Sequence, residues 1–381
     1  MNKNSQKLFC LFILFCYSIL INCRPFEFEA ALVYSNIYAD WDKTIEYLNK
    51  HLQKTPDDIE AYILLGKAYG MKEDYPKMNQ AFKKALFFIS DSLASHQVFK
   101  KDIEYLKDDF WCYAFNKGVD HFENHRLADA GMEFNNCIII DDTRAEAYIN
   151  LAIIEESIND FNSAIEHYEK AYALDSSDVN LMLYVGELYN TIGSYQQAIN
   201  SMDKVLSRQP HLVDAIIQKA LAYDFLEKID KAILYYEKAL KLLPNNSDVL
   251  YNLGRLYYSS GKYMKAIAQF KNILKNNPND AETIVLVGDS YFSLGEDIII
   301  ELEAATNSDS VKISDMKQTE MQRQAKEYFL DAIPYFEKAI QMKINDPDVW
   351  NMLAIAYSQA GLKEKAEKIS KKEYTFPAHL P

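Results

Sequence analysis

The side chains most suited to chemistry are a few histidines and cysteines, and their spacing limits what they could do. His121 and His125 lie four residues apart, which on a helix would place both imidazoles on one face as two ligands of a metal ion. No further ligands with a fitting spacing accompany them, and the sequence has no phosphate-binding glycine-rich loop, no GxSxG motif and no CxxC pair. We therefore predict no metal, no cofactor and no catalytic residues, and thus a protein that is not an enzyme.

Cys23 ends a segment with the features of an export signal. A short basic head precedes the mainly apolar residues 8–21, which are too few for a membrane span of roughly 20 residues but typical of a signal-peptide core. Leu20-Ile21-Asn22-Cys23 resembles a bacterial lipobox, although Asn22 stands where glycine, alanine or serine is usual. The resemblance implies removal of residues 1–22 as a signal peptide, lipidation of Cys23, and an anchor site at residues 23–24. An uncleaved signal anchor and a simple cleaved signal stay open as alternatives.

Two other cysteines, Cys112 and Cys137, would remain in the exported chain. They could form a disulfide in an oxidising compartment. However, Cys137 stands at a buried helix position that takes small residues, where a free cysteine commonly packs. The sequence leaves open whether they form a disulfide.

The charge of the chain argues against nucleic acid as a partner. The formal net charge is −14, and only Lys3 and Lys7 leave with residues 1–22, so the exported chain is more acidic still. Binding to a phosphate backbone needs clustered lysine and arginine. We therefore predict no nucleic-acid partner.

From Ala145 onward, five successive blocks of 34 residues begin in register without a gap. The blocks begin at Ala145, Val179, Val213, Ser247 and Ala281. Small residues stand at the eighth place (Ala152, Gly186, Ala220, Gly254, Gly288) and at the twentieth (Ala164, Ala198, Ala232, Ala266). Large ones stand at the twenty-fourth (Tyr168, Met202, Tyr236, Phe270), and proline at the thirty-second (Pro210, Pro244, Pro278).

This pattern resembles the tetratricopeptide repeat (TPR), a pair of helices that stacks on its neighbours. The small residues would let the two helices of a repeat approach, and the large ones would fill the remaining gaps. Glycines near the fifteenth place (Gly193, Gly261, Gly295, Gly361) would serve the tight turn between the helices. The resemblance implies an all-α fold, a right-handed superhelical solenoid of about nine helix-turn-helix repeats.

Two interruptions divide the predicted array. We expect N-terminal repeats over residues 25–92, an extra helix or a longer second helix over 93–110, and central repeats over 111–280. A further repeat over 281–346 would be split by an insertion at 297–328, whose two helical segments flank the sequence TNSDS and predict a projecting hairpin. Residues 347–381 would form the last repeat and a polar cap.

In TPR proteins the first helix of each repeat lines a concave groove, chiefly with the residues at places 2, 5, 9, 12 and 13. Transferring these places predicts a groove that is acidic and apolar, with Arg255 as its main cation and Phe225 at the thirteenth place of one repeat. The field of such a groove favours a neutral to basic partner with apolar anchors. The predicted partner-binding residues are Glu146, Ile149, Ile153, Asn180, Leu183, Glu187, Asn190, Asp214, Ile217, Leu221, Asp224, Tyr251, Arg255, Tyr258 and Asp289.

The function we expect is a non-catalytic scaffold that binds a protein or peptide in this groove. Its lipid at Cys23 would anchor it to a membrane of the bacterial cell envelope, on the periplasmic or surface face. In architecture it resembles TPR lipoproteins that assist outer-membrane protein assembly. The alternatives are an uncleaved, inner-membrane-anchored protein of chaperone type and a regulatory subunit of an enzyme complex.

Overall fold

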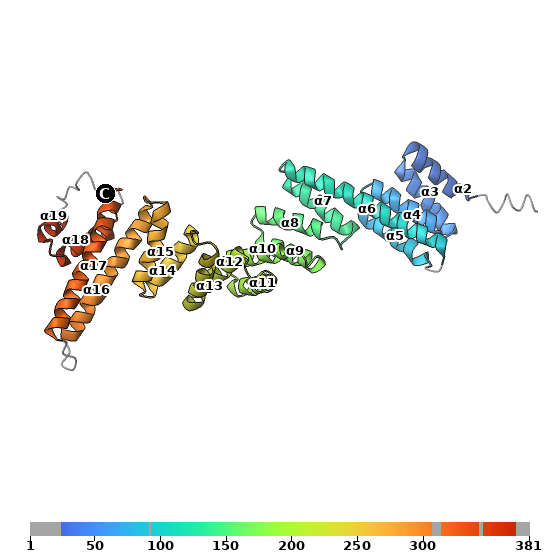
Figure 1. The fold of residues 1–381 in the computed structure, drawn as a ribbon. Helices are drawn as coiled ribbons and strands as arrows, with labels where there is room; N and C mark the ends of the chain where they lie inside the picture. Colours follow the sequence, from blue (N-terminus) through green and yellow to red (C-terminus); the bar gives the residue numbers. More distant parts are fainter. Residues whose placement is uncertain (1–23, 91–92, 307–313, 343–345, 371–381) are drawn as a thin grey trace, which may run out of the picture. The chain divides into compact units, whose positions relative to one another are not determined.

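The structure is a computed structural model that describes residues 24–90, 93–306, 314–342 and 346–370. In these ranges every regular element is helical, which confirms the predicted all-α class (Figure 1). The chain divides after Leu181 into two compact units. The predicted signal peptide and Cys23 lie outside the described residues.

The first unit holds the helices of the N-terminal and early central repeats. They are α2 (Phe26–Val33), the π-helix η1 (Tyr34–Tyr38), α3 (Trp41–Lys54), α4 (Ile59–Met71), α5 (Tyr75–Phe88), α6 (Ala94–Glu123), α7 (Leu127–Ile140), α8 (Ala145–Ser157) and α9 (Phe161–Leu174). Consecutive helices pack as pairs, α4 with α5, α6 with α7 and α8 with α9. These pairs are the predicted repeats.

The second unit begins inside α10 (Val179–Thr191). It continues with α11 (Tyr195–Arg208), α12 (Val213–Phe225), α13 (Ile229–Leu242), α14 (Ser247–Ser259), α15 (Tyr263–Asn276), α16 (Ala281–Thr306), α17 (Asp315–Gln341), α18 (Pro347–Gln359) and α19 (Lys363–Ser370). Pairs again form between α12 and α13, α14 and α15, α16 and α17, and α18 and α19. The last of them, α19, is mostly exposed and polar, as a capping helix should be.

Close contact between a small residue and an aromatic ring joins the helices of a pair. A Cβ added to Gly254 of α14 would lie 2.5 Å from the ring of Phe270, so the glycine lets this buried ring rest on the helix backbone. The same holds for Gly288 and Phe336, at 2.9 Å, although a long insertion separates them in the sequence. The insertion therefore leaves the packing of its repeat intact.

The turns between paired helices use a left-handed residue, as predicted at Gly193, Gly261 and Gly361, whose φ angles are 76°, 67° and 82°. The prediction was wrong for Gly295, which lies inside α16 against the ring of Phe329. Because α16 continues beyond the place at which the first helices of the other repeats end, it needs no turn there.

The first interruption differs from both forms that we expected. α5 ends at Phe88, and residues 94–110 are the first part of the single helix α6, whose second part is the first helix of the next repeat. The segment is thus neither a separate helix nor a longer second helix. It extends a first helix toward α4, with which α6 is in contact.

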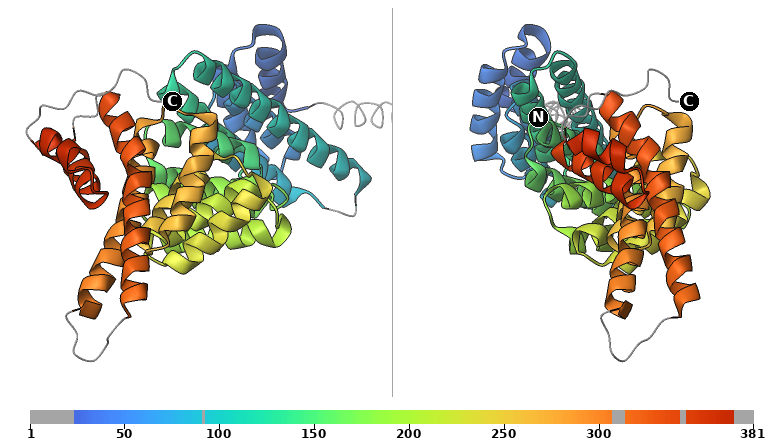
Figure 2. Two further views of the ribbon diagram at one scale, coloured as in Figure 1. Left: turned by 60° about the vertical axis from the view of Figure 1, so that its left-hand side comes forward. Right: turned by 90° about the vertical axis from the view of Figure 1, so that its left-hand side faces the viewer.

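The second interruption is a helical hairpin, as predicted. α16 and α17 are longer than the other helices of the second unit and pack along one another (Figures 1 and 2). The two arms run past the ends of α14 and α15 in both figures. Most of the predicted TNSDS turn lies outside the described residues.

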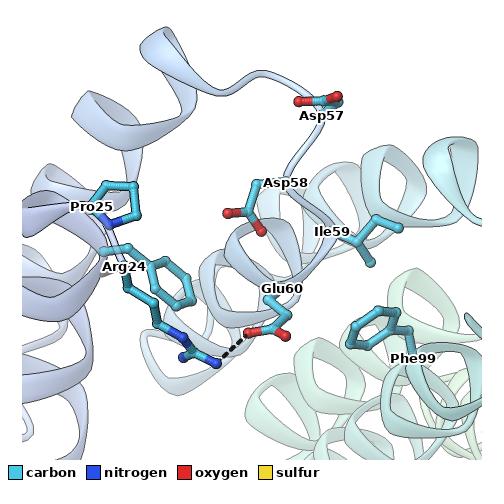
Figure 3. Close-up of a pocket in the computed structure, with 8 residues that line it drawn as sticks. Arg24, Pro25, Asp57, Asp58, Ile59, Glu60 and Phe99 are labelled. Atoms are coloured by element: carbon cyan, nitrogen blue, oxygen red, sulfur yellow. Dashed lines mark ion pairs between the residues drawn. The ribbon is translucent and has the colours of Figure 1, made fainter. Parts of the chain in front are cut away.

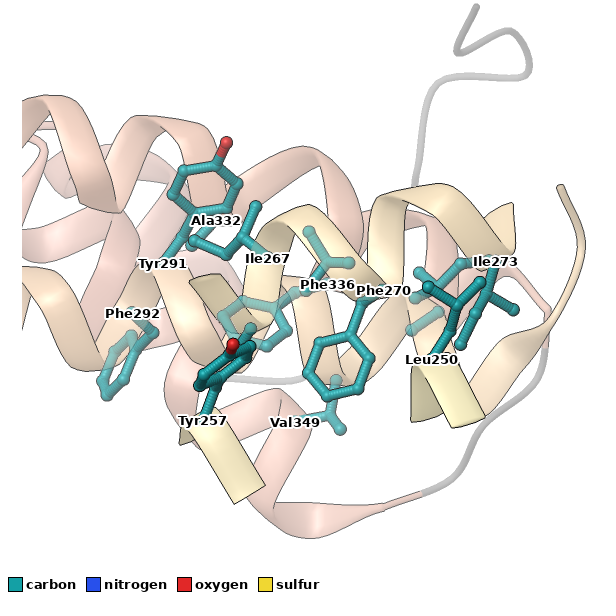
Figure 4. Close-up of a cluster of buried hydrophobic side chains, with 14 of the residues drawn as sticks. Leu250, Tyr257, Ile267, Phe270, Ile273, Tyr291, Phe292, Ala332, Phe336 and Val349 are labelled. Carbon is teal, nitrogen blue, oxygen red and sulfur yellow. The ribbon is translucent and has the colours of Figure 1, made fainter. Parts of the chain in front are cut away.

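Stacking of the pairs buries one continuous apolar core in the second unit, from Ile216 on α12 to Ile369 on α19. Figure 4 shows part of this core. Phe270 of one repeat and Phe336 of the next lie in this same core. A single helical pair could not bury these rings alone, so each repeat depends on its neighbours. The outcome is a row of first helices held at a fixed spacing.

Candidate partner-binding surface

The predicted binding residues lie on the first helices of successive repeats, but they divide between the two units. Glu146, Ile149 and Ile153 on α8 and Asn180 on α10 belong to the first unit. The others, on α10, α12, α14 and α16, belong to the second, and we call them together with Phe225 the helix-A stripe. It consists of Leu183, Glu187, Asn190, Asp214, Ile217, Leu221, Asp224, Phe225, Tyr251, Arg255, Tyr258 and Asp289.

Most of the helix-A stripe is accessible, with two exceptions. Asp214, Arg255 and Phe225 are exposed, the last with 57% of its surface, and most of the remaining members are half-buried. Leu183 and Asn190, however, are only 7% and 8% exposed, so little of either side chain is accessible to a partner. Asn190 is held inside the stack by hydrogen bonds to the next first helix, α12.

The partner of Asn190 is Gln218, which is not among the predicted partner-binding residues. The Asn190 amide nitrogen donates to the backbone oxygen and to the side-chain oxygen of Gln218 on α12, each at 3.0 Å. The Gln218 amide in turn lies 3.5 Å from Glu187 on α10. Gln218 stands at the sixth place of its repeat, and only the observed packing of α12 against α10 reveals its part in the surface.

Polar contacts between successive first helices continue along the helix-A stripe with a constant spacing of 31 residues. Arg255 of α14 forms an ion pair with Asp224 of α12, and the hydroxyl of Tyr251 donates to Glu282 of α16 at 2.6 Å. Burial raises the pKa of Asp224, and the nearby Arg255 opposes that shift. Arg255 is therefore paired, and because the ion pair cancels one charge of each sign, the surface keeps the net acidic charge that its sequence predicts.

The end of the helix-A stripe near the hairpin carries carboxylates with perturbed acidity. Burial raises the pKa of Asp289, and a hydrogen bond from Tyr258 opposes this shift. Burial, together with Asp289 and Asp297, also raises the pKa of Glu296. Glu296 and Asp297 follow Asp289 by two helical turns on α16, and they face it because the insertion continues the helix there. The hairpin thus adds acidic groups to this end of the surface.

The histidines and cysteines of the chain do not form a metal site within the described residues. His121 lies on α6, whereas His125 follows that helix in a left-handed turn with a φ of 58°. Across the described parts of the chain, no three His, Cys, Asp or Glu residues gather as a metal site would require. Cys112 is exposed and Cys137 buried, both are free thiols, and burial raises the pKa of Cys137 to about 12.

Comparison with family models identifies the repeat. Models described as tetratricopeptide repeat match residues 145–178, 226–283 and 335–368. The first of these matches begins at Ala145, where the predicted repeat begins, and it ends one residue before the next block. The chain is a tetratricopeptide-repeat protein. The TPR fold suggests a scaffold for protein–protein interaction, and members of this family generally bind proteins or peptides without catalysing a reaction.

Two curated relatives match part of this TPR chain. DnaJ homolog subfamily C member 7 of Mus musculus and that of Homo sapiens are each 24% identical over 136 residues, which is 36% of this chain. The chain spans about a quarter of the length of these relatives, 27%.

No helix among the described residues is both long and apolar enough to cross a membrane.

Several solved structures are similar to this chain at low sequence identity. MamA from Desulfovibrio magneticus RS-1 is 18% identical, with a TM-score of 0.42 over 45% of this chain and 96% of its own. PilF of Pseudomonas aeruginosa is 17% identical, with a TM-score of 0.41 over 63% of this chain and 99% of its own. YrrB, described as a TPR protein with an unusual peptide-binding site, is 23% identical, with a TM-score of 0.38 over 55% of this chain and 97% of its own.

Proposed function

We propose that this TPR protein is a non-catalytic scaffold that binds a segment of a partner protein along the helix-A stripe of its second unit. The observation that carries the proposal is the row of contacts between successive first helices, at Asn190–Gln218, Asp224–Arg255 and Tyr251–Glu282. Because these contacts hold the helices in register, the surface is ordered before a partner arrives, and less ordering entropy is lost on binding.

The chemistry of the surface favours a basic partner with apolar anchors. The helix-A stripe contains the carboxylates of Glu187, Asp214 and Asp289 but a single cation, Arg255, whose charge is already balanced by Asp224. A field of this sign attracts lysine and arginine and repels acidic segments. Phe225, which stacks on Tyr195 with ring centroids 4.9 Å apart, offers an exposed aromatic face for an apolar anchor.

A site-specific crosslink tests this proposal. A photoreactive benzoylphenylalanine at Phe225 should capture a partner segment rich in basic and apolar residues, since it lies within the helix-A stripe. The same group at Leu234, which is 47% exposed on the second helix α13, is the matched control. Equal yields at the two positions, or adducts at neither, would rule out the helix-A stripe as the binding surface.

Membrane anchoring through Cys23 completes the proposal. The first described helix, α2, begins at Phe26, so a lipid on Cys23 would hold the first repeats close to the bilayer. A multiply acylated cysteine gives a durable anchor, because each buried CH₂ contributes about 0.8 kcal/mol. We therefore place the scaffold at a membrane of the bacterial cell envelope, where it would act in the assembly of envelope proteins.

The intact mass of the native protein tests the anchor separately. The expected mass lacks residues 1–22 and includes acyl chains, while a Cys23→Ala variant should keep residues 1–22 and carry no acyl chains. A full-length mass without acyl chains would instead establish an uncleaved anchor. Neither result depends on the crosslink at Phe225, so the binding and anchoring parts can fail independently.

A further inference from the structure

The first unit contains a hollow that the repeat pattern alone does not produce. Two adjoining depressions of about 350 and 340 Å³ share Arg24, Phe28, Glu60 and Phe99, and we call them together the N-terminal pocket (Figure 3). It lies on α4, between the start of the described chain and α6. It uses none of the side chains of the helix-A stripe and therefore goes beyond the function proposed above.

The extension of α6 supplies one wall of the N-terminal pocket. Glu60, Ile63 and Lys67 line its floor, and they stand at places 2, 5 and 9 of their repeat, the places that define the helix-A stripe in the second unit. Phe99 and Asp102 come from residues 94–110, which no repeat requires. The first interruption of the array thus converts part of a first-helix surface into a bounded pocket.

Arg24 occupies this pocket through contacts that another cation could replace. Its guanidinium lies 3.2 Å from the Glu60 carboxylate and 5.3 Å from the centroid of the Phe28 ring. Both partners of the ion pair remain about half exposed, with 49% and 48% of their side-chain surface accessible. Exposed ion pairs are weak, so another cation can replace Arg24 beside Glu60 and over the buried Phe28 ring at little cost.

Around the guanidinium, the lining combines carboxylates with apolar side chains. Asp57, Asp58, Glu60 and Asp102 outnumber Arg24 and Lys67, so the pocket is acidic overall. Asp58 is already engaged, since it caps α4 at Ala61 and contacts His51 at 2.8 Å. Glu60 is therefore the carboxylate placed for a cation, beside the apolar surfaces of Phe28 and Phe99.

We propose that the N-terminal pocket binds an arginine side chain of an extended partner peptide, and that Arg24 occupies it as an internal mimic of that ligand. The partner's guanidinium would pair with Glu60 and stack on Phe28, and an apolar residue next to it would pack against Phe99. Arg24 would move out into solvent. The partner chemistry is that of a basic, partly apolar segment.

The test is fluorescence anisotropy of a labelled, end-capped decapeptide with a central Arg-Leu pair, and of the same peptide with citrulline for arginine. The full chain should bind the arginine peptide and not the citrulline one. Glu60→Gln should weaken binding about tenfold, whereas Arg24→Ala should strengthen it roughly threefold because the internal competitor is removed. Glu29→Gln removes the same charge from the exposed face of α2 outside the pocket and should leave affinity unchanged.

The direction of the Arg24→Ala effect decides the proposal. Equal or weaker binding by Arg24→Ala would show that Arg24 is not a competitor, and equal losses in Glu60→Gln and Glu29→Gln would show only general electrostatics. Absence of binding by every variant also overturns the proposal. Circular dichroism and the melting temperature of each variant verify that it is folded. The crosslink at Phe225 is unaffected by all of these results, so the two binding surfaces are judged separately.

Discussion

Replacing Gly254 with alanine is expected to destabilise the second unit, although alanine is the better helix former. The added methyl would lie 2.5 Å from the ring of Phe270, which is fully buried and cannot turn away. Overpacking of this kind costs about 1–3 kcal/mol, and the gain in helix propensity from glycine to alanine returns about 1 kcal/mol. A contact of 2.5 Å with a ring places the overpacking cost at the upper end of this range, about 2–3 kcal/mol. The net loss is therefore about 1–2 kcal/mol, or a fall in melting temperature of roughly 2–8 °C for a unit of this size.

The matched control is Gly186→Ala, at the same place of another repeat in the same unit. There the methyl would meet the terminal carbon of Met202 at 2.1 Å, and this flexible side chain can move aside. Thermal and urea unfolding of both variants, followed by circular dichroism, should show a clear loss for Gly254→Ala and a smaller change for Gly186→Ala. If Gly254→Ala were as stable as the parent, or if both variants lost equally, the argument from ring rigidity would be wrong.

Further predictions concern buried polar groups. Tyr357→Phe removes the hydroxyl that donates to the buried Glu337. The free energy of unfolding measured in urea should fall by about 1–2 kcal/mol, and an unchanged midpoint of urea unfolding would contradict this prediction. Burial raises the pKa of Asp289, so its stabilising contribution is complete below the unfolded value of about 3.9 and is lost as the pH rises through the folded pKa. The melting temperature of Asp289→Asn should therefore fall less between pH 4 and pH 7 than that of the parent protein. Parallel pH profiles of the two melting temperatures would contradict this prediction. Iodoacetamide at pH 8 should label exposed Cys112 in the native protein but label Cys137 only after denaturation, as peptide mass mapping would show; labelling of both at one rate would contradict the buried position of Cys137.

Features that depend on local spacing were predictable. The contact of Gly254 with Phe270 follows from two places in one repeat, and the left-handed turn at Gly261 follows from one. Both are set by steric requirements inside a single helical pair, so the identity and register of the residues suffice. For the same reason the two arms of the hairpin were correctly predicted as helices.

Features that depend on contacts between repeats were not predictable from the same pattern. Place numbers assigned Asn190 and Arg255 equally to the partner surface, yet one is buried and the other is paired with Asp224. Both outcomes depend on the side chain that a neighbouring first helix presents, 28 or 31 residues away. Gln218 escaped notice because the sixth place is not among those that usually contact a ligand.

By itself the sequence determined that this protein is an array of TPR helical pairs, because small and large residues at fixed places specify how two adjacent helices pack. It also determined that α16 and α17 extend beyond their repeat. Only the tertiary structure decided which side chains of the first helices remain accessible, since neighbouring repeats compete with any ligand for the same polar groups. Likewise, only the tertiary structure places Phe99 over α4 to form the N-terminal pocket, because no repeat rule describes where an inserted helix will lie.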